Sequence, residues 1–265
     1  MEDFLVLIHQ HAWILPVAGL SLGLLVGSHL AVLSLSIVDR HDTRRLTRRS
    51  CCPSCGQALP PHALIPVLSW LWQAGQCRHC RSPISLRYPA MELLTATITL
   101  VVVWQSGWQI ATAALLMLSW LLILMSWIDA EHLQLPDRLT LGALWLGLVC
   151  SLLPVTVDPA AAITGAAVGY VSLWSIYQLH RAITRREGMG YGDFKLFAAI
   201  GAWTGASALP GALVVAASLA LLYAALRWAV RRAGHESPIP FGPFLAVAGW
   251  FAIVSEHGMM DTTII

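Results

Sequence analysis

The sequence predicts an all-α polytopic membrane protein with about eight transmembrane helices. Three observations support this fold class. Hydrophobic residues make up 57% of the 265 residues and charged residues only 11%, and the mean hydropathy of +0.68 is too apolar for a water-soluble domain of this length. Long apolar runs follow one another along the chain. We find no ten-residue alternation of apolar and polar residues, which would indicate a β-barrel.

Eight apolar runs approach the ~20 residues that an α-helix needs to cross a bilayer, the sixth being the shortest. In chain order they are 12–38, 90–106, 110–128, 138–154, 159–180, 194–207, 210–228 and 241–256. The first run should remain as a helix, because it is too long for a signal peptide and Glu2 and Asp3 replace the basic region that such a peptide has. In the fifth run, Gly165 and Gly169 should let a neighbouring helix pack closely.

The basic residues predict the orientation of these helices. If each of the eight runs crosses the membrane, all of the basic residues fall on one side of it, and the turns at 107–109, 155–158 and 208–209 carry no basic residue. The positive-inside rule makes the basic side cytoplasmic and puts both termini outside. We therefore read the basic clusters as reporting topology and contact with the lipid bilayer, and we expect no nucleic-acid partner. They are Arg40, Arg44, Arg45, Arg48, Arg49, Arg78, Arg81, Arg87, Arg138, Arg181, Arg185, Arg186, Lys195, Arg227, Arg231 and Arg232.

The only long polar segment, 39–89, lies between the first and second runs. We expect four parts: a first transmembrane helix over 1–38, a cytoplasmic loop over 39–89, a seven-helix core over 90–256 and a tail over 257–265. The apolar stretch 63–72 inside the loop is too short to cross a membrane, so we expect it at the membrane surface or packed on the helices.

The loop carries two C-x2-C pairs, Cys52 with Cys55 and Cys77 with Cys80, and 21 residues separate the pairs. This is near the usual spacing of a four-cysteine zinc site, in which each pair directs two thiolates at one tetrahedral ion. Two disulfides are the alternative, but thiols on the predicted cytoplasmic side stay reduced. His79 is an alternative ligand. We predict a closed, structural zinc site made by the four cysteines.

Two aspartates lie where apolar runs meet polar turns. Asp129 follows the run that ends at Ile128, and Asp193 precedes the run that begins at Phe194. Acids at a membrane edge are costly, so they are rare unless they are capped, paired or used. Two carboxylates that meet can share one proton, and such a pair hydrolyses peptides when one acid deprotonates water and the other polarises the carbonyl. We therefore predict an aspartic-peptidase dyad.

The surroundings of these aspartates leave alternatives open. Asp193 could instead cap the helix that follows it, and we prefer that interpretation for Asp137. Capping does not explain Asp129, because the end of its helix disfavours an acid. Gly190 and Gly192 would let a substrate backbone come close. Glu92, near the start of the second run, needs a partner and is either structural or near the site.

A potassium-channel filter is the alternative from another class. Gly190-Tyr191-Gly192-Asp193 matches part of its signature, but Gly188 and Met189 stand in place of the usual Thr-Val, and the predicted orientation puts the segment on the cytoplasmic side.

Several motifs occur in the order found in the type IV prepilin leader peptidases, and the chain resembles that family from Gly27 to about Gly249. The motif Gly190-Tyr191-Gly192-Asp193-Phe194-Lys195-Leu196 is similar to the GxGD motif of presenilin-type proteases. Besides this motif and the paired cysteines, the motifs are Ile65-Pro66-Val67-Leu68-Ser69-Trp70, Leu86-Arg87-Tyr88-Pro89-Ala90-Met91-Glu92, Ile128-Asp129 with Leu135-Pro136-Asp137, and Ile239-Pro240-Phe241-Gly242-Pro243-Phe244-Leu245.

The resemblance implies a bifunctional enzyme of the bacterial inner membrane with its active site at the cytoplasmic face. Its catalytic aspartates would be Asp129 and Asp193, with Lys195 near the site. The substrates would be prepilins and pseudopilins of type IV pili and type II secretion, cut after a glycine. The new N-terminal residue would then be methylated with S-adenosylmethionine. Helix one reads Gly27-Ser28-His29-Leu30-Ala31-Val32, where the family usually has Gly-Ser-Phe-Leu-Asn-Val.

Overall fold

The computed structural model describes residues 13–38, 51–52, 54–107, 109–153, 156–186, 188–231 and 238–261. Within these ranges the regular structure is helical, and the β-type pairings are two isolated bridges, Cys51 with Ala58 and Gln76 with Pro83. The chain forms two compact units, residues 1–108 and 109–265. This boundary follows the second apolar run, whereas the predicted seven-helix core begins before it; that domain division stays a prediction.

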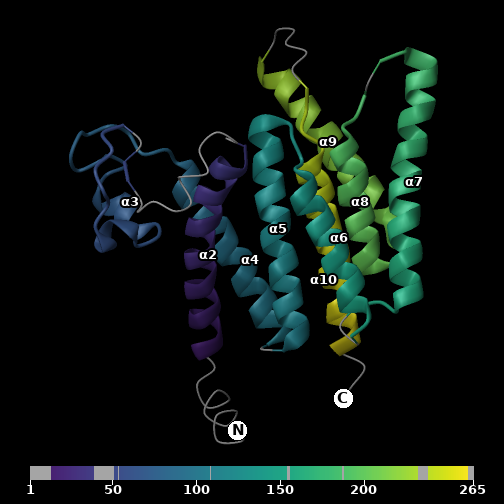
Figure 1. Cartoon of the computed structure of the whole chain (residues 1–265), viewed down its shortest axis with the longest axis horizontal. Helices are drawn as coiled ribbons and strands as arrows, with labels where there is room; N and C mark the ends of the chain where they lie inside the picture. The colour runs from purple at the N-terminus through teal and green to yellow at the C-terminus, as the bar shows by residue number, and fades with distance from the viewer. Residues whose placement is uncertain are drawn as a thin grey trace, which may run out of the picture. The chain divides into compact units, whose positions relative to one another are not determined.

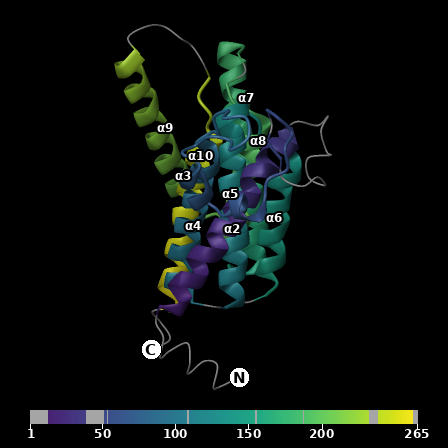
Figure 2. The same cartoon turned by 90° about the vertical axis from the view of Figure 1, so that its left-hand side faces the viewer.

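The N-terminal unit holds α2 (Ile14–Val38), η2 (Pro61–Leu64), α3 (Leu68–Trp72) and α4 (Arg87–Ser106). The two long helices lie side by side, as both views show (Figures 1 and 2). Glycines on α2 make this contact close. A Cβ at Gly23 would lie 2.5 Å from Cα of Ala96, and one at Gly27 would lie 2.7 Å from Cα of Glu92. Small residues therefore bring the two backbones together, as is common between membrane helices.

The C-terminal unit is a bundle of α5 (Ile110–His132), α6 (Asp137–Ser151), α7 (Pro159–Thr184), α8 (Tyr191–Thr204), α9 (Leu209–Arg231) and α10 (Gly242–Asp261). Helix α8 lies inside it and packs against α6, α7 and α10 (Figure 1). From Asp193 to Thr204, every side chain of α8 except that of Lys195 is buried. The helix that carries the candidate catalytic Asp193 in its first turn is therefore the core of the bundle.

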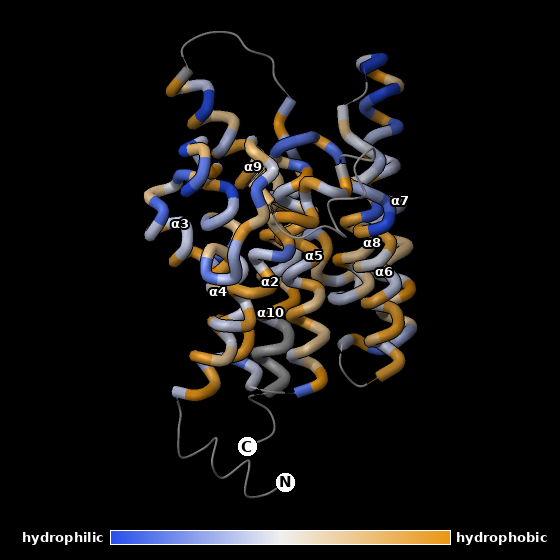
Figure 3. The backbone as a smooth tube through the Cα atoms, turned by 60° about the vertical axis from the view of Figure 1, so that its left-hand side comes forward, coloured by the Kyte–Doolittle hydropathy of each residue, from blue (hydrophilic) through white to orange (hydrophobic). Residues whose placement is uncertain are grey.

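The eight predicted apolar runs all form helices, which confirms the all-α fold class. Among the residues that the structure describes, five helices, α2, α4, α5, α7 and α9, are long and apolar enough to cross a membrane. Their outer faces carry many exposed apolar side chains, and hydrophobic residues dominate the long helices in Figure 3. Helices α6 and α8 have only 15 and 14 residues, or about 22 Å each, which is shorter than a hydrocarbon core of ~30 Å.

The contact between α7 and α8 confirms the predicted close packing at Gly165 and Gly169. A Cβ at Gly165 would collide with the carbonyl oxygen of Gly201, and one at Gly169 would lie 2.7 Å from that of Phe197. At the other end of the contact, Tyr177 packs on Phe194 with ring centroids 5.5 Å apart.

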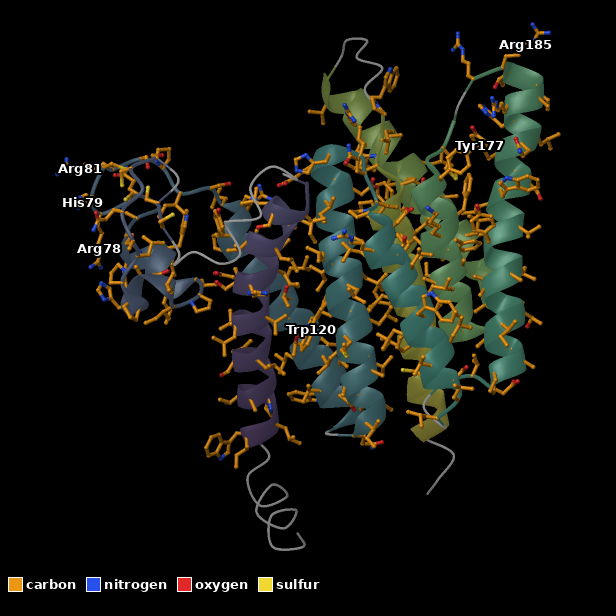
Figure 4. The ribbon with its side chains drawn as sticks, viewed as in Figure 1. Arg78, His79, Arg81, Trp120, Tyr177 and Arg185 are labelled. Carbon is orange, nitrogen blue, oxygen red and sulfur yellow. The ribbon has the colours of Figure 1, made fainter. Side chains whose placement is uncertain are left out.

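Helix α7 continues beyond the point where α8 begins. After Tyr177 it runs on to Thr184, roughly 10 Å further at ~1.5 Å per residue. Figure 4 shows the same offset, with Tyr177 inside the bundle and Arg185 at the far end of α7. The start of α8, which carries Asp193, is therefore recessed below the polar end of α7.

Candidate active site and metal centre

Asp129 lies three residues before the end of α5 and is only 6% exposed. Its Oδ2 accepts a hydrogen bond of 2.9 Å from the backbone N–H of Gly242, the first residue of α10. The C-terminal end of α5 disfavours a negative charge, whereas the N-terminal end of α10 favours one. A Cβ at Gly242 would lie 2.8 Å from that Oδ2. The carboxylate is thus held by a second helix, at a position where only glycine leaves it room.

Asp193 is the third residue of α8 and is 7% exposed. The helix begins at Tyr191 and its N-cap is Gly190, so the alternative that Asp193 itself is the N-cap is wrong. The side chain interacts instead with the backbone N–H of Gly190. An acid at this third position commonly reaches back in this way and lies at the positive end of the helix.

The two aspartates lie close enough to interact although 64 positions separate them in the sequence. The carboxylate of Asp129 is close enough to interact electrostatically with that of Asp193. Each is placed at the start of a helix, Asp193 in α8 and Asp129 against α10. Two acids in such a position cannot both ionise easily, and so they can share a proton.

The segment between α5 and α6 packs against this pair. Leu135 lies against both neighbouring glycines, because a Cβ at Gly192 would lie 2.5 Å from Cβ of Leu135 and one at Gly242 would lie 3.3 Å from its Cδ1. Gly192 therefore makes room for Leu135, a packing role that the sequence did not suggest. Gly190 has no such neighbour, since a Cβ there would meet only Asp193 Oδ2, at 3.8 Å.

Asp137 and Lys195 form an ion pair with 2.6 Å between Oδ1 and Nζ. The preferred interpretation of Asp137 as an N-cap is wrong, because Pro136 is the N-cap of α6 and Asp137 is the first residue of that helix. Its carboxylate instead reaches α8, two residues beyond Asp193. Lys195 thus lies two residues after Asp193 and is bound to an acid on another helix; its place near the active site stays a prediction.

The four predicted cysteine ligands form one cluster. The sulfurs of Cys52, Cys55, Cys77 and Cys80 all lie within 4.8 Å of one another, and the Cys52 and Cys80 sulfurs are 3.8 Å apart. Four sulfurs at ~2.3 Å from a tetrahedral zinc ion would be separated by about 3.8 Å. The donor set therefore fits one such ion. His79 contributes no ligand atom to the cluster and lies on the outer side of the loop with Arg78 and Arg81 (Figure 4).

The two C-x2-C pairs have the same backbone geometry. The N–H of Cys52 donates to the carbonyl of Gln57, and that of Cys77 donates to the carbonyl of Ser82, each at 2.9 Å. The residue after each pair, Gly56 or Arg81, has a positive φ, of 69° and 55°. These turns direct both sulfurs of each pair to the common centre.

The ionisation of the thiols also suits a divalent cation. The backbone N–H groups of Cys55 and Ser54 lower the pKa of Cys52 to about 6. The N–H of Gln57 also lowers the pKa of Cys55, but burial and the sulfurs of Cys52 and Cys80 outweigh it and raise that pKa to about 11. One thiolate therefore makes the ionisation of the next thiol less favourable, and a cation at the centre offsets this repulsion between negative charges.

Glu92 has its partners within the N-terminal unit. Its Oε2 accepts a 2.7 Å hydrogen bond from the backbone N–H of Val67, and the hydroxyl of Ser28 interacts with it as well. Val67 has φ 60° and ψ −52°, which is a strained conformation for a β-branched residue. Glu92 therefore links Val67, the residue before α3, to the first turns of α4. This contact supports a structural role for Glu92.

Comparison with known proteins decides the family. The model described as "Type IV leader peptidase family" matches residues 116–225, and "Bacterial Peptidase A24 N-terminal domain" matches residues 21–106. A protein of Aeromonas hydrophila named "Prepilin leader peptidase/N-methyltransferase" is 46% identical over 82% of this chain and 75% of its own length. The chain belongs to the type IV leader peptidase family.

Proteins with the same name in other bacteria are also similar to this leader peptidase family member. The one from Pseudomonas aeruginosa is 42% identical over 77% of this chain and 71% of its own length. The one from Xanthomonas campestris pv. campestris is 36% identical over 95% of both chains. No solved structure matches the chain.

The leader peptidase family model and the N-terminal model fall on different compact units. Residues 116–225 lie in the unit that holds both aspartates, and residues 21–106 lie in the unit that holds the cysteine cluster. The family resemblance inferred from the sequence motifs is confirmed.

The potassium-channel interpretation does not fit the structure or the family. A filter needs a run of backbone carbonyls that line a pore, whereas Tyr191, Gly192 and Asp193 form the first turn of a helix.

Sequence reasoning missed two residues of the site, Gly242 and Leu135. Both occur in motifs that carried the family resemblance, but no role followed from the letters alone. The only signals were a glycine next to Pro243 at the start of an apolar run and a leucine before Pro136. Neither signal says that the residue contacts an aspartate or its neighbouring glycine.

Proposed function

We propose that this chain cleaves the leader peptide of type IV prepilins and pseudopilins, with Asp129 and Asp193 as the catalytic dyad. One observation carries the proposal: two buried carboxylates from distant parts of the sequence lie close enough to interact, Asp193 in the first turn of α8 and Asp129 hydrogen-bonded to the first N–H of α10. The relatives' names supply the substrate class. The one-sided basic residues support an active site at the cytoplasmic face of the inner membrane.

In this mechanism one aspartate is ionised and the other is protonated. The ionised carboxylate takes a proton from a water molecule while the water oxygen bonds to the scissile carbonyl carbon. The protonated carboxyl gives its proton to the carbonyl oxygen, so a tetrahedral diol forms and the two aspartates exchange their protonation states. The carboxyl that holds the water proton then passes it to the amide nitrogen as the C–N bond breaks, the other carboxylate takes a proton from the diol, and the leader leaves with a new carboxyl group.

The surroundings of the two aspartates support these roles as base and acid. The N–H of Gly242 contacts Oδ2 of Asp129, and the N–H of Gly190 interacts with the carboxylate of Asp193, so a backbone donor holds each acid. The open space at Gly190 suits the approach of a substrate backbone. Because the start of α8 is recessed below the end of α7, the dyad is sheltered from bulk water while remaining near the membrane edge.

The test is cleavage of a co-expressed prepilin in membranes by Asp129→Asn and Asp193→Asn. Each substitution keeps the size of the side chain and removes its acid, so each should abolish cleavage. Asp158→Asn is the matched control, because Asp158 caps α7 with its side-chain oxygen and asparagine caps equally well. Wild-type cleavage by either dyad variant would show that the assignment is wrong.

We further propose that the chain methylates the new N-terminus, as the names of its relatives indicate. The amine nitrogen would attack the methyl carbon of S-adenosylmethionine, the sulfur–carbon bond would break, and the amine would release a proton. We assign no residue to the methyl donor. Mass spectrometry of a pilin matured in a host without its own enzyme decides the matter: a cut N-terminus without the added mass of a methyl group would contradict methylation.

We also propose that the cysteine cluster binds zinc. Cys52, Cys55, Cys77 and Cys80 would supply four thiolates, which leaves no open position for water or substrate. Zinc would therefore hold the loop in shape and take no part in hydrolysis.

A further inference from the structure

The segment from Leu133 to Asp137, between the end of α5 and the first residue of α6, contacts residues on or beside both candidate catalytic aspartates. Its first residue, Leu133, donates its backbone N–H to the carbonyl oxygen of Asp129 at 2.8 Å. Its last residue, Asp137, is paired with Lys195, two positions beyond Asp193, at 2.6 Å. Because the segment is short and bonded at both ends, it limits how far the end of α5 and the start of α8 can move apart.

The middle of the segment fills the space beside both aspartates. The Leu135 side chain packs against Gly192, next to Asp193, and against Gly242, whose N–H holds the carboxylate of Asp129. Pro136 follows it and restricts the Leu135 backbone to extended conformations. A leucine held in this way fixes the distance between the two surfaces it touches, because packed side chains resist compression.

We propose that the segment 133–137 is a positioning clasp: Leu135 is the spacer that sets the separation of the Asp129 and Asp193 carboxylates, and the Asp137–Lys195 ion pair holds the spacer in place. The proposal rests on the proposed function, because it assigns a role only if these aspartates are the dyad. Neither Leu135 nor Asp137 touches the substrate in this scheme.

The ion pair is suited to this role more than to stabilising the fold. The Asp137 side chain is 63% exposed and that of Lys195 is 24% exposed, and exposed pairs add little to the free energy of unfolding. Its geometry is what matters, since it joins the first residue of α6 to the first turns of α8. Loss of the pair would free the far end of the clasp while the rest of the bundle kept its packing.

The first test is Leu135→Ala, with kcat and KM measured for a purified prepilin substrate per folded molecule. A displacement of about 1 Å in a catalytic group costs about 100-fold in rate, so we expect kcat to fall roughly 10- to 100-fold with KM unchanged. Leu135→Met conserves volume and should restore most of the rate. The matched control is Leu141→Ala on α6, because Leu141 lies outside the clasp and is 39% exposed.

The second test is a double-mutant cycle of Asp137→Asn and Lys195→Gln. Each single variant should lower kcat by roughly two- to fivefold, and the double variant should be no slower than the worse single one, since both remove the same contact. Arg138→Gln, the next residue of α6 and an exposed one, is the charge control.

The outcomes separate the clasp from the dyad. If wild-type protein cleaves while Leu135→Ala keeps the wild-type kcat, the clasp is refuted and the dyad stands. If Lys195→Gln remains harmful in the Asp137→Asn background, Lys195 acts directly at the site and the ion pair is not part of a clasp. If wild-type protein does not cleave at all, the proposed function itself fails.

Discussion

Replacing Gly242 by alanine tests the link between α10 and Asp129 most directly. The new Cβ would lie 2.8 Å from Oδ2 of Asp129 and 3.2 Å from its Cγ, whereas ordinary contacts begin near 3.4 Å. The carboxylate must therefore move by about 0.6 Å, because repulsion rises steeply below contact distance. That displacement weakens the 2.9 Å hydrogen bond from the Gly242 N–H. It also changes the spacing from Asp193.

The expected size follows from these two effects. A hydrogen bond to a charged group contributes about 1.5–3 kcal/mol, which corresponds to about 10- to 100-fold in rate when the bond supports the transition state. We expect Gly242→Ala to lower kcat for prepilin cleavage by that factor, with KM little changed. The assay is the cleavage rate of a purified prepilin in detergent or liposomes, normalised to folded enzyme.

Two glycines provide controls for this prediction. A Cβ at Gly142 on α6 would meet no atom within 4 Å, so Gly142→Ala should leave cleavage unchanged and stabilise the helix by about 0.5–1 kcal/mol. A Cβ at Gly249 on α10 would lie 2.6 Å from the Ile200 side chain. Gly249→Ala should therefore lower the thermal stability and spare kcat. Wild-type kcat in Gly242→Ala would refute the role of α10 in holding Asp129.

Four further predictions concern other parts of the chain. Gly165→Leu should destabilise the bundle by at least 1–3 kcal/mol, because its side chain would meet the backbone of α8 at Gly201; thermal unfolding in detergent measures this, and an unchanged midpoint would contradict the close contact. Reduced protein should carry one zinc ion per chain by metal analysis, and a chelator should loosen the loop before cleavage stops. In that loop Gly56→Ala should destabilise the folded loop by about 1 kcal/mol and Arg81→Gly should stabilise it, since both positions have positive φ; protease resistance of the zinc-loaded protein compares them. Labelling of single introduced cysteines from outside the cell should reach positions 107 and 158 and miss 45 and 185, and the reverse pattern would overturn the predicted orientation.

The sequence by itself determined the fold class, the helix positions and the candidate residues. A chain this apolar must bury its backbone polar groups in helices within a membrane, so the runs had to be helical. The cysteine spacing predicted the sulfur cluster, because a two-residue gap suffices to bring two thiolates to one centre. The small residues Gly165 and Gly169 predicted a close helix contact, since only a missing side chain lets two backbones approach.

Only the tertiary structure decided how the site is assembled. No local rule shows that Asp129 is held by the first N–H of α10, because that contact joins positions 113 residues apart. The same is true of Asp137, whose place beside Pro136 suggested a cap but whose carboxylate reaches Lys195 on the neighbouring helix α8. Helix packing sets such contacts through the shapes of all the side chains between them. A single sequence fixes the chemistry of each residue, whereas the distance between two residues far apart in that sequence depends on the packing of the whole bundle.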